Sequence, residues 1–270
     1  MIETRHTSVI QHTLAAAAFG DRPGDWPLPT ASGPEQLWLR AVAAGGQGRY
    51  GSAYRDLAVL RRSASDGRWA SLAHSTHGSF LRQLGWHTLA RGWDGRALAL
   101  AGGDPEARAD ALIGLAADAL GIGRFAAAAT LLRRVDLTPG TVPERLSVRR
   151  GWVAAELAMA SSDGRSAVRH AEEAVELAGA MGQPSARHRV KSEVVLAAAL
   201  CSAGEIERAR AVAESALDAT GRLNLTPLRW ALACLLIDIE SVTFSEQNLQ
   251  EIRDICAGQV RRAGGAWRSA

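Results

Sequence analysis

Apolar and small residues recur at helical spacing along most of this chain, and the pattern restarts at a nearly fixed interval. Each copy is marked by a small turn residue and by an Ala five residues later. The turn residues are Gly48, Gly85, Gly123, Ser162 and Gly204, which are 37, 38, 39 and 42 residues apart. Self-similarity of this period is typical of stacked helical repeats. The pattern therefore predicts a row of antiparallel helix pairs that are joined at these turns.

Small residues lie at matching positions on both sides of each turn. Five residues after the turn stand Ala53, Ala90, Ala128, Ala167 and Ala209, and seven residues before it stand Ala41, Gly78, Ala116, Ala155 and Ala197. Small side chains let two helices approach closely, and larger ones would force them apart. Two residues after the turn, Tyr50, Phe125 and Ile206 begin the second helix, and we expect them to fill the space between the paired helices.

Prolines fall between the repeats rather than within the expected helices. They are Pro105, Pro139, Pro143, Pro184 and Pro227. Proline in a helix interior costs about 3 kcal/mol. Because the prolines recur only between the repeats, their positions support the same repeat register.

The two ends of the chain depart from the repeat, as terminal caps do. We expect a first helix over 3–19 and a proline-rich, non-helical strap or linker over 21–29. We expect a helix over 226–242 that is apolar on almost every side. Such a helix must pack against another element, and we expect a second helix over 246–262 to pair with it. The expected domains are 1–34, the repeat array 35–217, and a capping pair with its tail, 218–270. We expect 264–270 to be frayed.

These repeats resemble the tetratricopeptide repeat family over residues 35 to 217. The third and fifth units carry the resemblance best, through Leu112, Leu115, Ala116, Gly123, Phe125 and Ala128, and through Leu196, Ala197, Gly204, Ile206 and Ala209. The resemblance implies an all-α protein, a right-handed α-solenoid of about five helix pairs with helical caps. It also implies that a concave groove is lined by Leu37, Arg40, Ala44, His74, His77, Leu81, Leu112, Leu115 and Ala119.

Composition narrows the class of protein. Alanine, the best helix former, is the commonest residue. The net charge is only +3. Thirty arginines stand beside the single Lys191, a ratio that codon bias alone would give. Nucleic acid is therefore not an expected partner. Cys201, Cys234 and Cys256 form no Cys-x-x-Cys pair, which favours buried thiols in a reducing compartment. With no apolar run of about 18 residues, we expect no membrane partner and a cytoplasmic protein.

Motifs that carry chemistry are few. Gly46 to Gly51 matches the Gly-x-Gly-x-x-Gly string of dinucleotide-binding proteins, but here it follows a helix instead of a strand. His74 and His77 share a helix face, with His87 across the turn as the nearest third metal ligand. A solvated or groove-facing pair is the simpler interpretation. We expect no metal, no cofactor and no catalytic residues, hence no enzyme.

The partner is expected to be another protein. Arg133, Arg134, Arg145, Arg149 and Arg150 crowd the junction of the third and fourth repeats, where a cluster of arginines could receive an acidic segment. With Leu37, Arg40, His74, His77, Leu81, Leu112 and Leu115, the last three of these arginines form the predicted partner site. The sequence predicts a non-catalytic scaffold or adaptor that holds an acidic or amphipathic peptide or helix. The alternative is a regulatory sensor, similar to the helical-repeat domains of transcription regulators, which binds a small effector and self-associates as a homo-oligomer.

Overall fold

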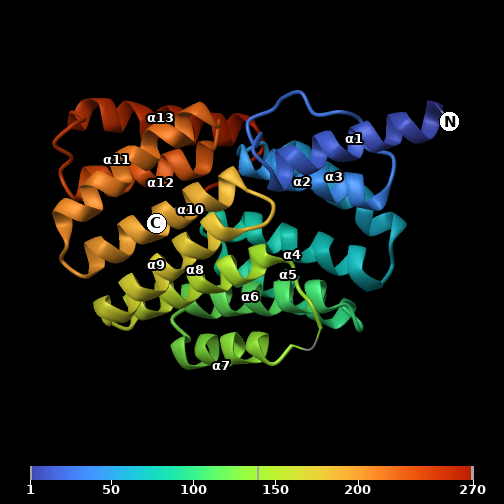
Figure 1. The fold of residues 1–270 in the computed structure, drawn as a ribbon, viewed down its shortest axis with the longest axis horizontal. Helices are drawn as coiled ribbons and strands as arrows, with labels where there is room; N and C mark the ends of the chain where they lie inside the picture. The colour runs from blue at the N-terminus through green and yellow to red at the C-terminus, as the bar shows by residue number, and fades with distance from the viewer. Residues whose placement is uncertain (1, 139, 269–270) are drawn as a thin grey trace.

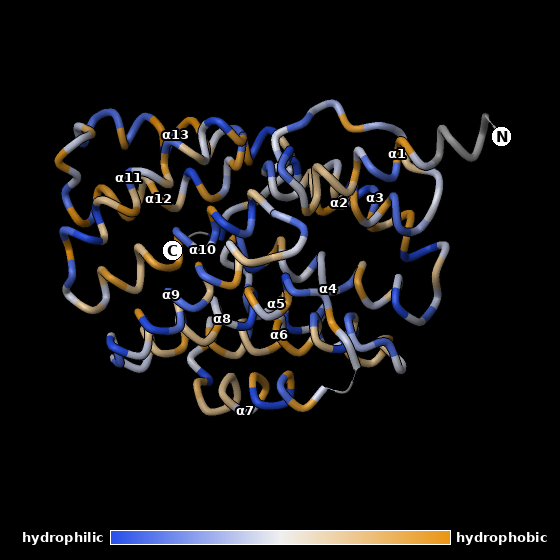
Figure 2. The backbone as a smooth tube through the Cα atoms, in the orientation of Figure 1, coloured by the Kyte–Doolittle hydropathy of each residue, from blue (hydrophilic) through white to orange (hydrophobic). Residues whose placement is uncertain are grey.

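The structure, a computed structural model, describes residues 2–138 and 140–268, with side chains from residue 8 onward. These residues form thirteen α-helices and no strand. The expectation of an all-helical α-solenoid is therefore confirmed. Figure 2 shows polar and apolar residues alternating along most helices, as amphipathic helices require when each packs one face on its neighbours.

Each repeat supplies two helices, which follow the capping helix α1(Ile2–Phe19). The first helices of the pairs are α2(Pro34–Gly46), α4(Gly67–Gln83), α6(Pro105–Gly121), α8(Glu144–Ala160), α10(Ala186–Ser202) and α12(Thr226–Asp238). The second helices are α3(Tyr50–Ser63), α5(His87–Leu100), α7(Phe125–Asp136), α9(Gly164–Ala180), α11(Ile206–Arg222) and α13(Glu246–Arg262). Pro34, Pro105 and Pro227 stand in the first turn of their helices, where a missing N–H costs nothing. Pro139 lies outside the described residues.

The turn residues explain the glycine period. Gly48, Gly85, Gly123 and Gly204 have φ between 76° and 89°, the left-handed region that suits glycine. Ser162 takes the same conformation, with φ 59°, in the fourth unit. The pairs therefore share one turn geometry even where the glycine is missing.

The small residues lie where two helices of a pair cross. Ala53, Ala90, Ala128, Ala167 and Ala209 are all 0% exposed, and so are Ala41, Ala116, Ala155 and Ala197. Position 78 requires glycine for a different reason. A Cβ added at Gly78 would lie 2.7 Å from a carboxylate oxygen of the buried Asp94.

The residues that begin the second helices do not all fill the space between the paired helices. Tyr50 does so, being fully buried. Phe125 instead is 39% exposed, because α7 packs at the outside of the molecule and leaves the start of this helix uncovered.

The expected frayed tail is ordered as far as the structure describes it, and this expectation was wrong for 264–268. The backbone N–H of Arg268 donates to Leu84 O at 2.9 Å, and the Trp86 indole donates to Ala266 O at 2.7 Å. The Gly51 N–H donates to Ala263 O at 2.7 Å. The end of the last pair thereby binds the turns of the first two pairs, and in Figure 1 α13 runs up to α2 and α3. The array closes on itself.

The N-terminal helix and the strap, residues 20–33, cover the space that an open array would leave as a groove. Phe19, at the end of α1, packs on Trp38 of α2 with ring centroids 5.2 Å apart, and on His188 of α10 at 6.1 Å. The Ala186 N–H donates to Gly20 O at 3.0 Å. Gln47, the residue that follows α2, holds the strap through bonds to Pro23 O and Asp25 O. The inner face is thus largely filled by the chain itself.

Candidate functional site

Arg40, predicted to face a groove, is instead a structural link between three segments. Its guanidinium binds both carboxylate oxygens of Asp56 on α3, at 2.8 and 2.5 Å, and donates to Pro29 O in the strap at 3.3 Å. Asp56 is 3% exposed. Arg40 therefore neutralises a buried carboxylate and has little left to offer a partner.

His74 and His77 pack between α3 and α5 and do not face the inner space. The His77 ring stacks on Trp93 of α5 at 3.8 Å and lies 4.5 Å from the Tyr54 ring of α3. His74 bonds to Ala70 O of its own helix. Burial and then the Arg61 charge lower the pKa of His77 to about 4, so the ring is neutral at pH 7. Across the described residues, no group of three or more His, Cys, Asp or Glu is arranged to hold a metal ion.

The apolar groove positions are mostly core. Leu112 and Ala44 are 0% exposed, Ala119 is 3% and Leu37 is 8%. Leu81 and Leu115 are half-buried. In the closed array these side chains pack on neighbouring helices, so they offer a partner little surface.

The structure divides the predicted arginine cluster into two groups. Arg150 turns outward and binds Asp136 of α7 through two bonds of 2.5 and 2.6 Å, while Arg133 and Arg134 are exposed. Arg145 and Arg149, one helical turn apart on α8, turn inward and pair with Glu106 and Asp110 of α6. Only this inward pair contributes to an internal site.

The inward arginines line a small hollow that we call the arginine chamber. It has a volume of about 60 Å³ and lies among α1, α2, α4, α6, α8 and α10. Arg145, Arg149 and Arg187 provide its basic wall, and Asp110 provides the single carboxylate. Arg187 was missed at the level of sequence, although it stands 17 residues before the turn residue Gly204, as Arg145 does before Ser162.

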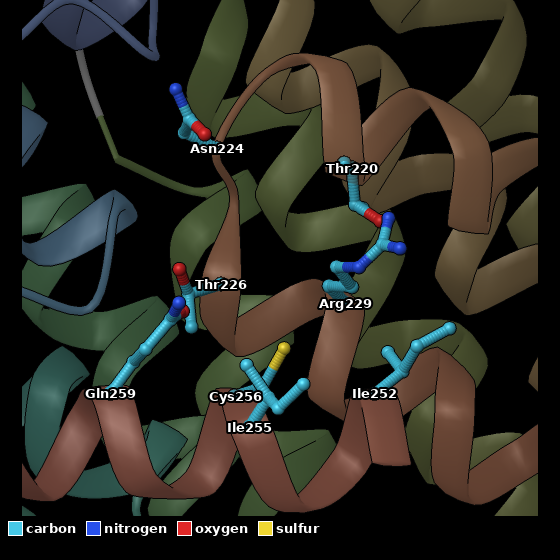
Figure 3. A pocket seen from close by; sticks show the side chains of 9 residues that line it. Thr220, Asn224, Thr226, Arg229, Ile252, Ile255, Cys256 and Gln259 are labelled. Atoms are coloured by element: carbon cyan, nitrogen blue, oxygen red, sulfur yellow. The ribbon is translucent and has the colours of Figure 1, made fainter. Parts of the chain in front are cut away.

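A second, larger hollow lies where the array closes. Two adjoining parts, of about 430 and 610 Å³, share Asn224, Thr226 and Gln259 and together form what we call the closure cleft. Figure 3 shows one part of it. Ile252, Ile255, Cys256 and Gln259 project from α13, opposite Thr220, Asn224, Thr226 and Arg229. The other part is bounded by the strap and by the turn between α2 and α3.

The closure cleft combines positive charge with apolar surface. Its lining includes Arg49, Arg229 and Arg262 and no carboxylate. The Arg49 guanidinium lies 4.1 Å from the Trp26 ring, which is 41% exposed, and Ile255 on α13 is 57% exposed. No local sequence signal marks this site, because it joins residues about 200 positions apart that meet only when the array closes.

Comparison with known proteins adds one likeness. No protein-family model matches the chain, and no curated protein matches it. Among solved structures, a tetratricopeptide repeat protein from Parabacteroides merdae is similar to it. That protein is 13% identical, with a TM-score of 0.46, and the match covers 95% of this chain and 94% of the other. The description of the fold as a helical-repeat array rests on the six helix pairs themselves. In the described part of the chain, no helix is both long and apolar enough to cross a membrane.

Proposed function

We propose that this chain is a non-catalytic protein-binding scaffold that holds an acidic, amphipathic peptide or helix of another protein in the closure cleft. The observation that carries the proposal is the lining of the cleft, which has three arginines, apolar side chains of α13 and no carboxylate. The groove of the array is a poorer candidate, since α1 and the strap already fill it.

The two kinds of surface in the cleft have separate roles. Ile252 and Ile255 would contact the apolar face of the partner, and burial of such side chains supplies most of the binding free energy. Arg49 and Arg262 would pair with its carboxylates, and Trp26 beside Arg49 is the kind of exposed ring that anchors interfaces. Because charges on an exposed rim are screened over about 8–10 Å, we expect binding to weaken with salt without vanishing.

The proposal is tested by affinity capture followed by a direct measurement. The partner captured by the parent protein is identified by mass spectrometry, purified, and titrated against the parent and against Arg49→Glu/Arg262→Glu. Reversal of two rim charges should weaken binding by at least about tenfold, mainly at low salt. Arg133→Glu/Arg134→Glu is the matched control, because these exposed arginines lie on α7, away from the cleft.

The outcomes separate the cleft from other surfaces. Equal binding by the cleft variant and the parent overturns the proposal. Capture only of further copies of this chain, lost in the cleft variant, would make the cleft a surface for self-association.

A further inference from the structure

Charged residues at one repeat position form a ladder through four consecutive units. Arg68, Glu106, Arg145 and Arg187 each stand 17 residues before the turn residue of their unit, at 85, 123, 162 and 204. Glu106 binds Arg68 on one side and Arg145 on the other. The charges along the ladder are therefore positive, negative, positive and positive, and the last arginine has no acidic neighbour on the ladder.

Arg187 also lacks a carboxylate from elsewhere. Among the described residues it makes no ion pair; its one hydrogen bond, to Val42 O, is long at 3.3 Å, and its guanidinium lies 5.7 Å from the Phe19 ring centroid. Arg187 is half-buried, and an arginine partly withdrawn from water normally pairs with a carboxylate or other acceptors. Burial, and then the charge of Arg145, lower the pKa of Arg187 to about 10. The guanidinium stays charged at pH 7 in a place that disfavours its charge.

Two further observations at the chamber indicate an anion. Ser75 Oγ lines it, is almost fully buried, and has no hydrogen-bond partner in the described structure. The wall carries three arginines, of which Arg149 is paired with Asp110 and Arg145 with Glu106, whereas Arg187 has no carboxylate partner. His188 adds no charge, because burial, followed by Arg187, Arg145 and Arg149, lowers its pKa well below 6.5.

We propose that the arginine chamber binds a dianionic phosphate group, either free phosphate or the phosphate of a small phosphomonoester, with Arg187 as its principal partner. A doubly charged oxyanion would complete the charge ladder next to Arg187 and accept a hydrogen bond from Ser75. A phosphomonoester carries about −1.5 to −2 charges at pH 7, whereas a carboxylate carries one, so the three arginines attract the phosphate more strongly.

The dimensions of the chamber limit the ligand. A volume of about 60 Å³ admits a small group such as a phosphate and excludes a peptide chain. Ser79 and Gln83 are half-buried and exposed, so the chamber communicates with solvent on the α4 side, and the rest of a phosphomonoester could remain there. The site is separate from the closure cleft, so it does not depend on the proposed protein partner.

The test uses three anions at matched ionic strength. Sodium phosphate, O-phosphoserine and sodium acetate are titrated at pH 7.5 into the full chain, with sodium chloride as the reference, while the melting temperature is followed. The dissociation constants are then measured by calorimetry. We expect a saturable rise in melting temperature with phosphate or phosphoserine, and the more effective of the two identifies the source of the phosphate group.

Two variants and one control assign the site. Arg187→Gln should weaken binding by about tenfold or more, since it removes a charge-assisted partner, and it should not unfold the chain because Arg187 has no ion pair to break. Ser75→Ala should weaken binding less. Arg189→Gln, an exposed position on the same helix, should bind as the parent does. The proposal is overturned if neither phosphate compound exceeds chloride and acetate, or if Arg187→Gln binds as tightly as Arg189→Gln.

Discussion

The two halves of the array are stabilised by different chemistry. From α2 to the start of α8, the core contains six buried charged side chains, each at most 7% exposed, namely Asp56, Asp94, Glu106, Asp110, Asp118 and Arg145. From Gly151 to Arg268, the buried polar residues are only Ser185, His188, Ser192 and Thr220. The core there is aliphatic, built from Ala, Val, Leu and Ile of α9 to α13. Both halves nevertheless share one turn and one helix crossing.

The difference shows that the repeat determines the backbone geometry, while the chemical type of the buried side chains varies from unit to unit. The ionic half is also the half that contributes most of the arginine chamber. In it, Arg82 lies between Asp94 and Asp118, which are both 0% exposed. Buried ion pairs seldom add net stability over a well-packed apolar core, but they orient their members and are costly to break.

The largest effect is expected from Arg82→Leu. It would leave two buried carboxylates without a cation, and removal of one partner from a buried ionic group costs typically about 3–5 kcal/mol. The matched change in the other half is Arg208→Leu, whose pairs with Glu172 and Glu205 are exposed and whose loss should leave the melting temperature almost unchanged. Thermal denaturation of both variants measures the contrast. Equal melting temperatures for the two variants would contradict the burial of Asp94 and Asp118.

Overpacking should act alike in both halves. Ala128→Trp and Ala209→Trp each place an indole at a fully buried helix crossing, where the cost is typically about 1–3 kcal/mol and more where the backbone cannot move. Ala126→Trp, on the exposed face of α7, is the control. A normal melting temperature for the Ala128 and Ala209 variants would contradict the shared crossing geometry.

His77, in the ionic half, should make the folded chain less stable in mild acid. The pKa of His77 is about 4 in the folded chain, below the ordinary 6.5, because of burial and then the Arg61 charge. Between about pH 4 and pH 6.5, His77 binds a proton in the unfolded chain but not in the folded chain. The stabilisation is complete above pH 6.5 and is lost as the pH falls through 6.5 toward 4. Asp118 acts in the opposite sense, since burial raises its pKa to about 7.

The measurement is the melting temperature of the parent and of His77→Gln between pH 7.5 and 5. The variant should lose less stability in acid than the parent. If both curves have the same slope, His77 is not a source of the pH dependence.

The smallest effect concerns the turn of the fourth unit. Ser162 has φ 59°, a conformation that costs a non-glycine residue about 1 kcal/mol, so Ser162→Gly should raise stability by about 0.5 kcal/mol. Gly204→Ser tests the same geometry in reverse, because a side chain there meets no atom within 4 Å and only the backbone conformation opposes it. Opposite signs for the two changes in chemical denaturation would support one turn geometry, and like signs would contradict it.

The backbone of this protein could be predicted from sequence much better than its sites. Turn glycines and crossing alanines are local signals, so the helix pairs followed from them, and α12 and α13 followed from their apolar spacing. The groove positions were inferred from the family register, which assumes an open array. Here the tail, Ala263 to Arg268, closes the array and Phe19 packs on Trp38, while His77 packs between Tyr54 of α3 and Trp93 of α5.

The two internal sites required contacts that no local pattern encodes. Arg145 and Arg149 were found because they stand together on one helix. Arg187 belongs with them only through its equivalent place in the next repeat, and its lack of a carboxylate partner depends on three-dimensional packing. The closure cleft has no sequence signal of its own, since Trp26 and Arg262 come from opposite ends of the array.

The bonds from Ala263, Ala266 and Arg268 to the first two turns also bear on how the chain unfolds. A linear stack of repeats unfolds from its ends, because each unit contacts only its neighbours. Here the last pair is bonded to the first two, so neither end is free to melt alone. These contacts join residues about 180 to 210 positions apart, which raises the contact order and slows folding. The number of units is fixed as well, because adding or deleting one would place the tail out of reach of Leu84 and Gly51.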